Sequence, residues 1–193
     1  MTLLAIGLPA AIGLIVLARP IAEIVVGERF RAEAALLIPL IVVAALLRDL
    51  KAYYLDLAFY LGHRTARQLW VTVIAAVASV LLNLVLIPIF GIYGAAYGAI
   101  ATYSLALVTS GLLGREVFAL PGPGADDLKV ALAAAGMGLA LWLLAGPRGV
   151  VPLLAQIAGG ALVYAALLCI LNAAGARIQL MQLLGRGRRQ GTF

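Results

Sequence analysis

The uncharged run between Gln68 and Gly114 constrains the fold more than any other part of the sequence. It is long enough for two membrane-spanning helices of about 20 residues each, joined by a very short link. Within it, Pro88 removes a backbone donor and disfavours helix at Ile87, and Gly91 supplies the backbone freedom that a sharp reversal needs. We therefore predict a membrane hairpin whose helices cover about residues 69–87 and 94–113.

Small residues follow the predicted turn in a helical pattern. Gly94 and Gly98 have the small-xxx-small spacing that lets a neighbouring helix approach closely. Asn83, near the end of the preceding span, is expected to form a hydrogen bond between helices rather than to bind a ligand. Four hydroxyl side chains are expected to bond to their own helix backbone: Thr102, Ser104, Thr109 and Ser110. The residues assigned to helix packing and the turn are Asn83, Pro88, Gly91, Gly94 and Gly98.

The composition places the chain in a membrane. Hydrophobic residues make up 65% of the 193 residues and charged residues 11%, which is too few charges to cover the surface of a soluble domain. We predict an all-α polytopic membrane protein with about six transmembrane helices in one bundle. The predicted spans are approximately residues 3–26, 34–61, 69–87, 94–113, 128–145 and 151–173. Residues 1–176 form the predicted bundle, and residues 177–193 form a basic cytoplasmic tail.

The charged residues carry information about orientation and partners. The formal net charge is +6, and most basic residues fall in the expected loops and the tail. This excess suits the anionic headgroups of membrane lipids and does not indicate a nucleic-acid partner. Lys and Arg are more frequent in the loops on the side of the two termini, which predicts that both termini are cytoplasmic.

Ionisable residues interrupt the second predicted span, residues 34–61. An ionised side chain near the middle of a bilayer costs at least ~2.5 kcal/mol unless it faces a wet cavity or a partner. At about 100° per residue, Asp49, Tyr53, Asp56 and Tyr60 share one stripe of a regular helix. Arg48 and Lys51 lie beside that stripe. We predict that this face lines an aqueous cavity, with the cavity-lining residues Arg48, Lys51, Asp49, Tyr53, Asp56 and Tyr60.

Two alternatives for these charges remain open at this stage. Arg48 could pair with Asp49 and Lys51 with Asp56, so that the charges neutralise each other and only hold helices together. If instead the span ends near Leu47, the charges lie at the membrane interface and are ordinary.

No pattern in the sequence indicates catalysis. It contains no His/Cys cluster with metal-ligand spacing, no Ser/His/Asp arrangement and no glycine-rich phosphate loop followed by Lys. We therefore predict a protein that is not an enzyme and that binds no cofactor and no metal.

The string around the hairpin turn carries a family resemblance. Asn83 is followed by Leu86-Ile87-Pro88, then by Gly91-Ile92 and Gly94-Ala95-Ala96, and then by a small-residue helix containing Thr102 and Ser104. This string resembles the carboxy-terminal half of the polysaccharide-transporter branch of the multidrug/oligosaccharidyl-lipid/polysaccharide flippase superfamily. The resemblance is strongest over residues 81–104, is also present over residues 20–62, and extends over about residues 5–170.

The resemblance implies a function. Such proteins look like two helical bundles around a central cavity, and they move lipid-linked oligosaccharides across the bacterial cytoplasmic membrane by alternating access. Arg48 and Lys51 are matched by location to the basic cavity residues that hold the anionic headgroup of the cargo. The chain has room for one bundle only, so we expect that an amino-terminal bundle or a second subunit completes the pathway, with a lipid-linked anionic glycan and membrane lipids as the other partners.

Two other functions compete with the flippase interpretation. The drug or cation antiporters of the same superfamily favour acidic cavity residues without basic ones, so Arg48 and Lys51 argue against that branch. A non-transporting subunit that anchors a polysaccharide assembly complex would need the helix-packing residues but not the two cations.

Overall fold

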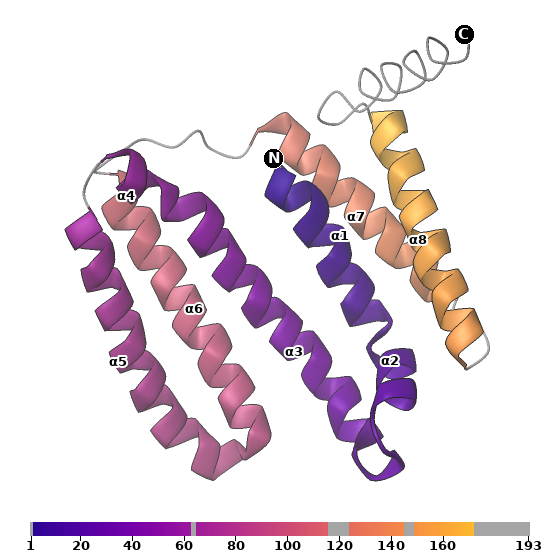
Figure 1. Cartoon of the computed structure of the whole chain (residues 1–193), viewed down its shortest axis with the longest axis horizontal. Helices are drawn as coiled ribbons and strands as arrows, with labels where there is room; N and C mark the ends of the chain where they lie inside the picture. The colour runs from indigo at the N-terminus through magenta and orange to yellow at the C-terminus, as the bar shows by residue number, and fades with distance from the viewer. Residues whose placement is uncertain (1, 63–64, 116–123, 145–148, 172–193) are drawn as a thin grey trace, which may run out of the picture. The chain divides into compact units, whose positions relative to one another are not determined.

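The computed structural model describes residues 2–62, 65–115, 124–144 and 149–171. The regular elements among these residues are all helical, which confirms the predicted all-α architecture (Figure 1). In chain order they are α1 (Thr2–Val16), α2 (Ala18–Val25), a 3-10 turn (Glu28–Phe30), α3 (Arg31–Leu50), a π-helical turn (Lys51–Leu55), α4 (Leu57–Leu61), α5 (Thr65–Phe90), α6 (Ile92–Arg115), α7 (Ala125–Leu143) and α8 (Val150–Leu171).

Four or five of the six predicted spans are present as long apolar helices in the described part of the chain. The four are Glu28–Leu61, Ala66–Phe90, Ile92–Arg115 and Val150–Leu171, and a fifth is counted if Leu3–Val16 and Ala18–Val25 make one broken span. The predicted span 128–145 corresponds to α7, whose first turns carry Asp126, Asp127 and Lys129 and leave a shorter apolar stretch. The predicted tail, residues 177–193, and the end of the last predicted span lie outside the described residues.

The helices pack as two compact units rather than as the single predicted bundle. One unit contains α1 together with α7 and α8, and the other contains the helices from α2 to α6. The chain passes from the first unit to the second between Val16 and Leu17, where the first predicted span, 3–26, is interrupted.

The predicted hairpin is the α5–α6 pair, and its turn is tighter than expected. Both helices continue to the turn, so Pro88 lies inside α5 and the reversal takes place at Gly91, whose φ is 59°. This region of backbone conformation favours glycine. Pro88 has no backbone N–H, so the carbonyl of Leu84 lacks its helical donor, and membrane helices tolerate such a proline where nearby groups satisfy the freed carbonyl. The predicted span 69–87 therefore ends three residues before α5 does.

Gly94 brings the backbones of α5 and α6 into contact just after the turn. A Cβ atom at this position would lie 2.1 Å from the carbonyl oxygen of Leu86, which is far inside van der Waals distance. Four residues later, a Cβ atom on Gly98 would lie 3.0 Å from Oδ1 of Asn83. Both glycines are buried, and a larger residue at either position would push the two helices apart.

A row of small buried residues continues along the whole of α6. Its members recur every fourth residue: Gly94, Gly98, Thr102, Ala106, Ser110 and Gly114. Because an α-helix turns by about 100° per residue, each step of four moves the row by about 40° around the helix. The row therefore begins facing α5 and ends facing the π turn and α4, where Gly114 lies close to Ala58 and to the carbonyl of Leu55. Figure 1 shows α6 between α5 and α3 within this unit.

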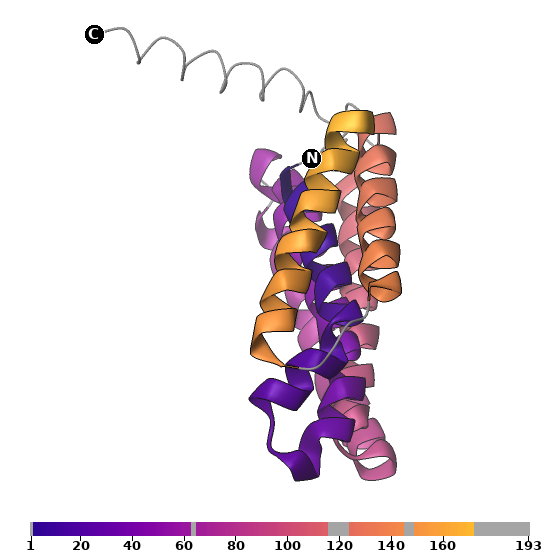
Figure 2. The ribbon, with the colours of Figure 1, turned by 90° about the vertical axis from the view of Figure 1, so that its right-hand side faces the viewer.

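In the other unit, α7 packs against both α1 and α8, and α7 and α8 run side by side in both views (Figures 1 and 2). Gly138 of α7 faces Ile12 of α1, whose Cγ2 would lie 2.5 Å from an added Cβ atom. Tyr164 of α8 donates a hydrogen bond of 2.7 Å to the carbonyl oxygen of Ala5 in α1. That carbonyl lacks its helical donor because the residue four positions later is Pro9. The tyrosine thus satisfies a backbone acceptor that the proline leaves free.

The contact at Gly94 gives a stability prediction. Replacing Gly94 by Ala should lower the free energy of unfolding by about 1–3 kcal/mol, because the new methyl group overlaps a backbone atom that cannot rotate away. Unfolding in detergent micelles measures this loss. Gly111→Ala is the matched control on the same helix, since its nearest neighbour would be Cδ1 of Leu55 at 3.9 Å. Equal stability of the two variants would contradict the close approach.

The hydrogen bond of Tyr164 gives a second one. Tyr164→Phe should lower the free energy of unfolding by about 1–3 kcal/mol, because it leaves the Ala5 carbonyl in an apolar setting without a donor. Tyr97→Phe serves as the control, since the Tyr97 ring packs edge-on against Phe90 at 6.0 Å and this contact survives the change. If both changes have the same effect, the proposed role of the Tyr164 hydroxyl is wrong.

Candidate functional site

A π-helical turn breaks the charged helix at the point where its ionisable residues gather. The backbone N–H of Asp56 donates to the carbonyl of Lys51 at 2.9 Å, five residues back instead of the usual four. The turn separates α3 from α4 and contains one residue more than a regular helical turn. Such turns are rare in helices and are found frequently at functional sites. This segment is therefore the first candidate for a functional site.

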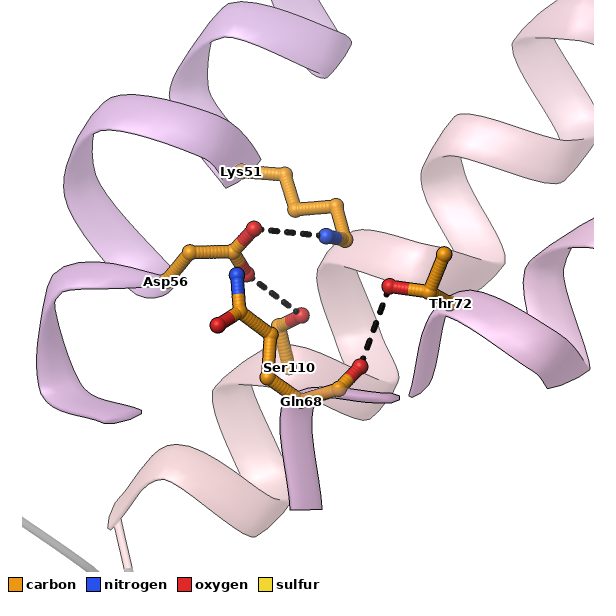
Figure 3. Close-up of polar contacts among 5 residues, drawn as sticks. All are labelled: Lys51, Asp56, Gln68, Thr72 and Ser110. Carbon is orange, nitrogen blue, oxygen red and sulfur yellow. Dashed lines mark hydrogen bonds and ion pairs between the residues drawn. The ribbon is translucent and has the colours of Figure 1, made fainter. Parts of the chain in front are cut away.

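The turn holds a buried ion pair. Nζ of Lys51 lies 2.8 Å from Oδ2 of Asp56, and the two side chains are only 13% and 8% exposed. The hydroxyl of Ser110, on α6, donates to the other carboxylate oxygen of Asp56 at 3.2 Å (Figure 3). Both oxygens of the carboxylate therefore have a partner. In Figure 3 the Gln68 side chain also extends toward this carboxylate from α5, and the Gln68 backbone carbonyl accepts a hydrogen bond from Thr72. We refer to Lys51, Asp56 and Ser110 as the polar cluster.

Small residues on α6 bring the polar cluster together. Gly114 would place an added Cβ atom 3.4 Å from Cβ of Ala58 and 3.8 Å from Phe59, so α4 lies directly on the α6 backbone. Ala58 and Phe59 are fully buried in this contact. Because α4 and the π turn approach α6 so closely, the short side chain of Ser110 reaches Asp56.

The polar cluster lies near one end of the α5–α6 hairpin. Ser110 comes five residues before Arg115, which is about 7.5 Å along the helix axis, whereas the 24 residues of α6 extend for about 36 Å. The predicted continuous span, residues 34–61, has these charges near its middle. Since α3 ends at Leu50 beside this end of α6, the charges are closer to the end, as in the interfacial alternative.

The six predicted cavity residues do not share one face. Asp56 is buried, but Tyr53 and Tyr60 are 68% and 59% exposed, and they point away from the packed interior of the unit. Arg48 and Asp49 form a separate pair, with Nη2 of Arg48 3.1 Å from Oδ1 of Asp49 and side chains 57% and 39% exposed. The predicted stripe of Asp49, Tyr53, Asp56 and Tyr60 is therefore not the arrangement found.

The π turn explains this difference. One additional residue in the turn shifts the helical phase of everything after it by about 100°, so Asp56 rotates away from the face of Asp49. Asp56 then meets α6 instead of continuing the stripe. In α4, Ala58 and Phe59 take the packed positions, and Tyr60, the next residue, points outward.

The structure contains both ion pairs of the alternative in which the charges neutralise each other, Arg48 with Asp49 and Lys51 with Asp56. Ser110 joins the second pair by donating to Asp56, so the expected bond of Ser110 to its own helix backbone is not the one found. The spacing of four that relates Ser110 to Gly94 and Gly98 was the available signal, because it places the hydroxyl on the buried side of α6.

Asn83 also differs from expectation. Its amide donates to the carbonyl of Ser79 at 2.8 Å, one turn earlier on α5, so this hydrogen bond lies within one helix rather than between two. Its Oδ1 atom faces Gly98 of α6, and the residue acts in packing at that contact. Among the described residues, no three His, Cys, Asp or Glu side chains gather in a way that could hold a metal ion.

The arrangement suits exchange of ionic partners better than bond chemistry. Lys51 offers an ammonium group on a flexible side chain, and its carboxylate partner is held independently by Ser110. If the Lys51 ammonium group binds another partner, Asp56 therefore still accepts a hydrogen bond from Ser110. An anionic group that reaches this end of the hairpin would compete with Asp56 for the ammonium group.

Comparisons of the chain with protein-family models, with curated proteins and with solved structures found no match in any of the three.

The buried pair gives a test of its own energetics. Lys51→Met and Asp56→Leu should each lower the free energy of unfolding by about 3–5 kcal/mol, because each leaves one buried charge without its counter-ion. The double variant should lie close to the wild type in stability, since it removes both charges and keeps similar volumes. Unfolding in micelles measures all three.

The pair of Arg48 and Asp49 is the matched control for this cycle. It lies a few residues away but is largely exposed, so Arg48→Met should change the free energy of unfolding by less than about 1 kcal/mol. A cycle in which Lys51→Met is as mild as Arg48→Met would show that the Lys51–Asp56 pair is well solvated.

Proposed function

We propose that this chain is part of a transporter that moves a lipid-linked oligosaccharide or polysaccharide precursor across the bacterial cytoplasmic membrane by alternating access. The observation that carries the proposal is the buried ion pair of Lys51 and Asp56 in an otherwise apolar helical unit. Ionisable groups among membrane-length helices are costly and are kept at substrate, ion or proton sites. The π turn at the same place supports a functional rather than a purely structural origin.

In this proposal, Lys51 is the contact for a phosphate of the cargo. Asp56 neutralises the ammonium group while the cargo is absent, and the phosphate replaces the carboxylate as its counter-ion on arrival. Ser110 keeps one carboxylate oxygen hydrogen-bonded during the exchange. Arg48, which is largely exposed, is a second cation for the same anionic headgroup, and the exposed rings of Tyr53 and Tyr60 are available to sugar groups.

The resemblance of residues 81–104 to polysaccharide transporters supports the class of cargo, and it also implies a second bundle. The long helix α5 is consistent with this, because almost none of its apolar stretch is buried within the chain. We propose that an amino-terminal bundle or a second subunit completes the pathway. The excess of Lys and Arg in the loops on the side of the termini supports a cytoplasmic position for both ends.

A second candidate function is favoured by a specific observation. Arg48 and Lys51 each have a carboxylate partner within the chain. A protein that only anchors other proteins needs no cation for a cargo, so this internal pairing suits it. In that case the polar cluster fixes the position of α3 relative to α6 and has no cargo. A drug or cation antiporter is less well supported, because the cluster contains a buried cation.

The double variant Lys51→Met/Asp56→Leu distinguishes the two candidates. It should remain folded, because both buried charges are removed together. As part of the completed transporter in a flippase-null cell, it should fail to restore surface polysaccharide if Lys51 binds cargo. The matched control is Glu28→Gln, which removes the carboxylate of an exposed pair whose closest atoms are 3.5 Å apart and keeps the hydrogen bond from Arg31 to the Val26 carbonyl.

The anchoring candidate gives a different pattern. A folded double variant that restores surface polysaccharide to the wild-type level would exclude Lys51 as a cargo contact and favour the anchor. Gly98→Leu should abolish function under both candidates, because Gly98 has Asn83 of α5 within 3.0 Å of an added Cβ atom. This variant therefore reports whether the assay depends on correct packing of the chain.

A further inference from the structure

An apolar groove lies between α7 and α8, in the unit that does not contain the polar cluster. Its volume is about 270 Å³, and its lining combines residues near the end of α7 with residues between Pro152 and Val163 of α8. Among the described residues that line it, Gln156 is the only one with a polar side chain, and none is charged. None of the lining residues belongs to the polar cluster.

Glycines explain where the two helices touch and where they separate. Gly160 lets α8 approach Leu141, whose side-chain carbons would lie 3.1 Å from an added Cβ atom. Its neighbour Gly159 faces open space, with no atom within 4 Å of the corresponding position. The helices are therefore in contact at Gly160, while the groove opens beside Gly159 and extends toward Leu144 and Pro152, at the loop end of the pair.

A groove of this composition in a membrane fills with hydrocarbon. Apolar cavities of about 150 Å³ stay free of water and take up small hydrocarbons, because water finds no hydrogen-bond partners in them. The groove is larger, and α8 is long and apolar enough to cross a membrane. The large residues of α8 near the groove, such as Leu154 and Ile157, are exposed, so bilayer lipid has direct access to this face.

Gln156 gives the groove one polar group, so a pure hydrocarbon is not its best occupant. Its amide is the one polar side-chain group among the described residues that line the groove, and an amide in an apolar medium is costly unless it is hydrogen-bonded. It lies six residues after Val150, or about 9 Å along α8, in the outer third of a span of 22 residues. An occupant that satisfies the amide must carry an uncharged polar group near the outer end of its hydrocarbon chain.

We propose that the groove between α7 and α8 binds one acyl chain of a bilayer glycerophospholipid, with its ester group hydrogen-bonded to the amide of Gln156. The ester is neutral, as the uncharged lining requires, and it is the polar group that a lipid acyl chain carries at its outer end. A lipid diphosphate would instead need cations, and the described residues that line the groove provide none.

The test uses the full chain in nanodiscs that contain a phosphatidylcholine with a photoreactive diazirine in one acyl chain. After illumination, mass spectrometry maps the labelled peptides. Labelling per exposed residue should be several-fold higher on the groove side of α7 and α8 than on α5, whose long apolar face is equally open to lipid. Uniform labelling of all lipid-facing helices would overturn the proposal, as would protection of the groove by a second copy or another segment of protein.

Groove-filling variants make the test specific. Gly159→Leu adds a side chain where the structure has open space, so it should fold normally and reduce labelling of the groove several-fold. Ala155→Leu fills the groove from a second position and should act in the same way. Ala161→Leu is the matched control, because Ala161 is exposed on the same helix outside the groove and should leave labelling unchanged. Equal labelling of Gly159→Leu and Ala161→Leu contradicts the assignment.

Gln156→Leu tests the ester contact separately. Loss of one hydrogen bond of about 1 kcal/mol should weaken retention of the phospholipid about fivefold. Retention is measured by native mass spectrometry of the full chain as detergent removes lipid. A diazirine-bearing alkane without an ester should label the wild type and the Gln156→Leu variant equally. Unchanged phospholipid retention in Gln156→Leu would show that the groove does not recognise the ester.

Discussion

A row of small side chains that recurs every four residues along α6 determines how closely that helix approaches α5 at one end and α4 at the other. At Gly94 the row puts α6 against the backbone of α5, and at Gly114 it puts α6 against α4. The same interval is responsible for the change of neighbour, because four residues exceed one helical turn by about 40°. In a bilayer the hydrophobic effect does not drive helices together, so close backbone contacts of this kind carry much of the association.

The polar cluster depends on this packing. An ammonium group and a carboxylate are stable in an apolar unit only when they stay within contact distance and their remaining atoms find partners. The π turn places Lys51 and Asp56 at such a distance, and the narrow gap at Gly114 lets Ser110 bond to the second carboxylate oxygen. The helical turn that departs from regular geometry is thus also the turn that holds the buried charges. A regular helix would have directed Asp56 toward the side of Asp49, away from α6.

Much of the architecture could be predicted from the sequence, because membrane-length apolar runs and glycine spacing are direct consequences of bilayer thickness and helix geometry. The spacing of Gly94 and Gly98 predicted a close neighbour, and α5 is that neighbour. Other features leave no periodic signal. A single inserted residue in a helix, as at the π turn, changes the facing of Asp56 without changing the composition of the segment. Pro88 predicted a helix end at Ile87, but α5 continues to Phe90, because membrane helices accept an internal proline. The partner of Ser110 depends on a tertiary contact, because Asp56 and Ser110 are 54 positions apart in the chain.

The hydrogen bond from Tyr164 to the Ala5 carbonyl has a consequence for the order of assembly. Because α1 precedes α8 in the chain, it leaves the ribosome and enters the membrane well before α8 is synthesised. Until α8 inserts, the carbonyl that Pro9 exposes has no donor within α1, and lipid hydrocarbon offers none. The unit of α1, α7 and α8 is therefore completed only after α8 has inserted, and until then α1 keeps one unsatisfied backbone acceptor.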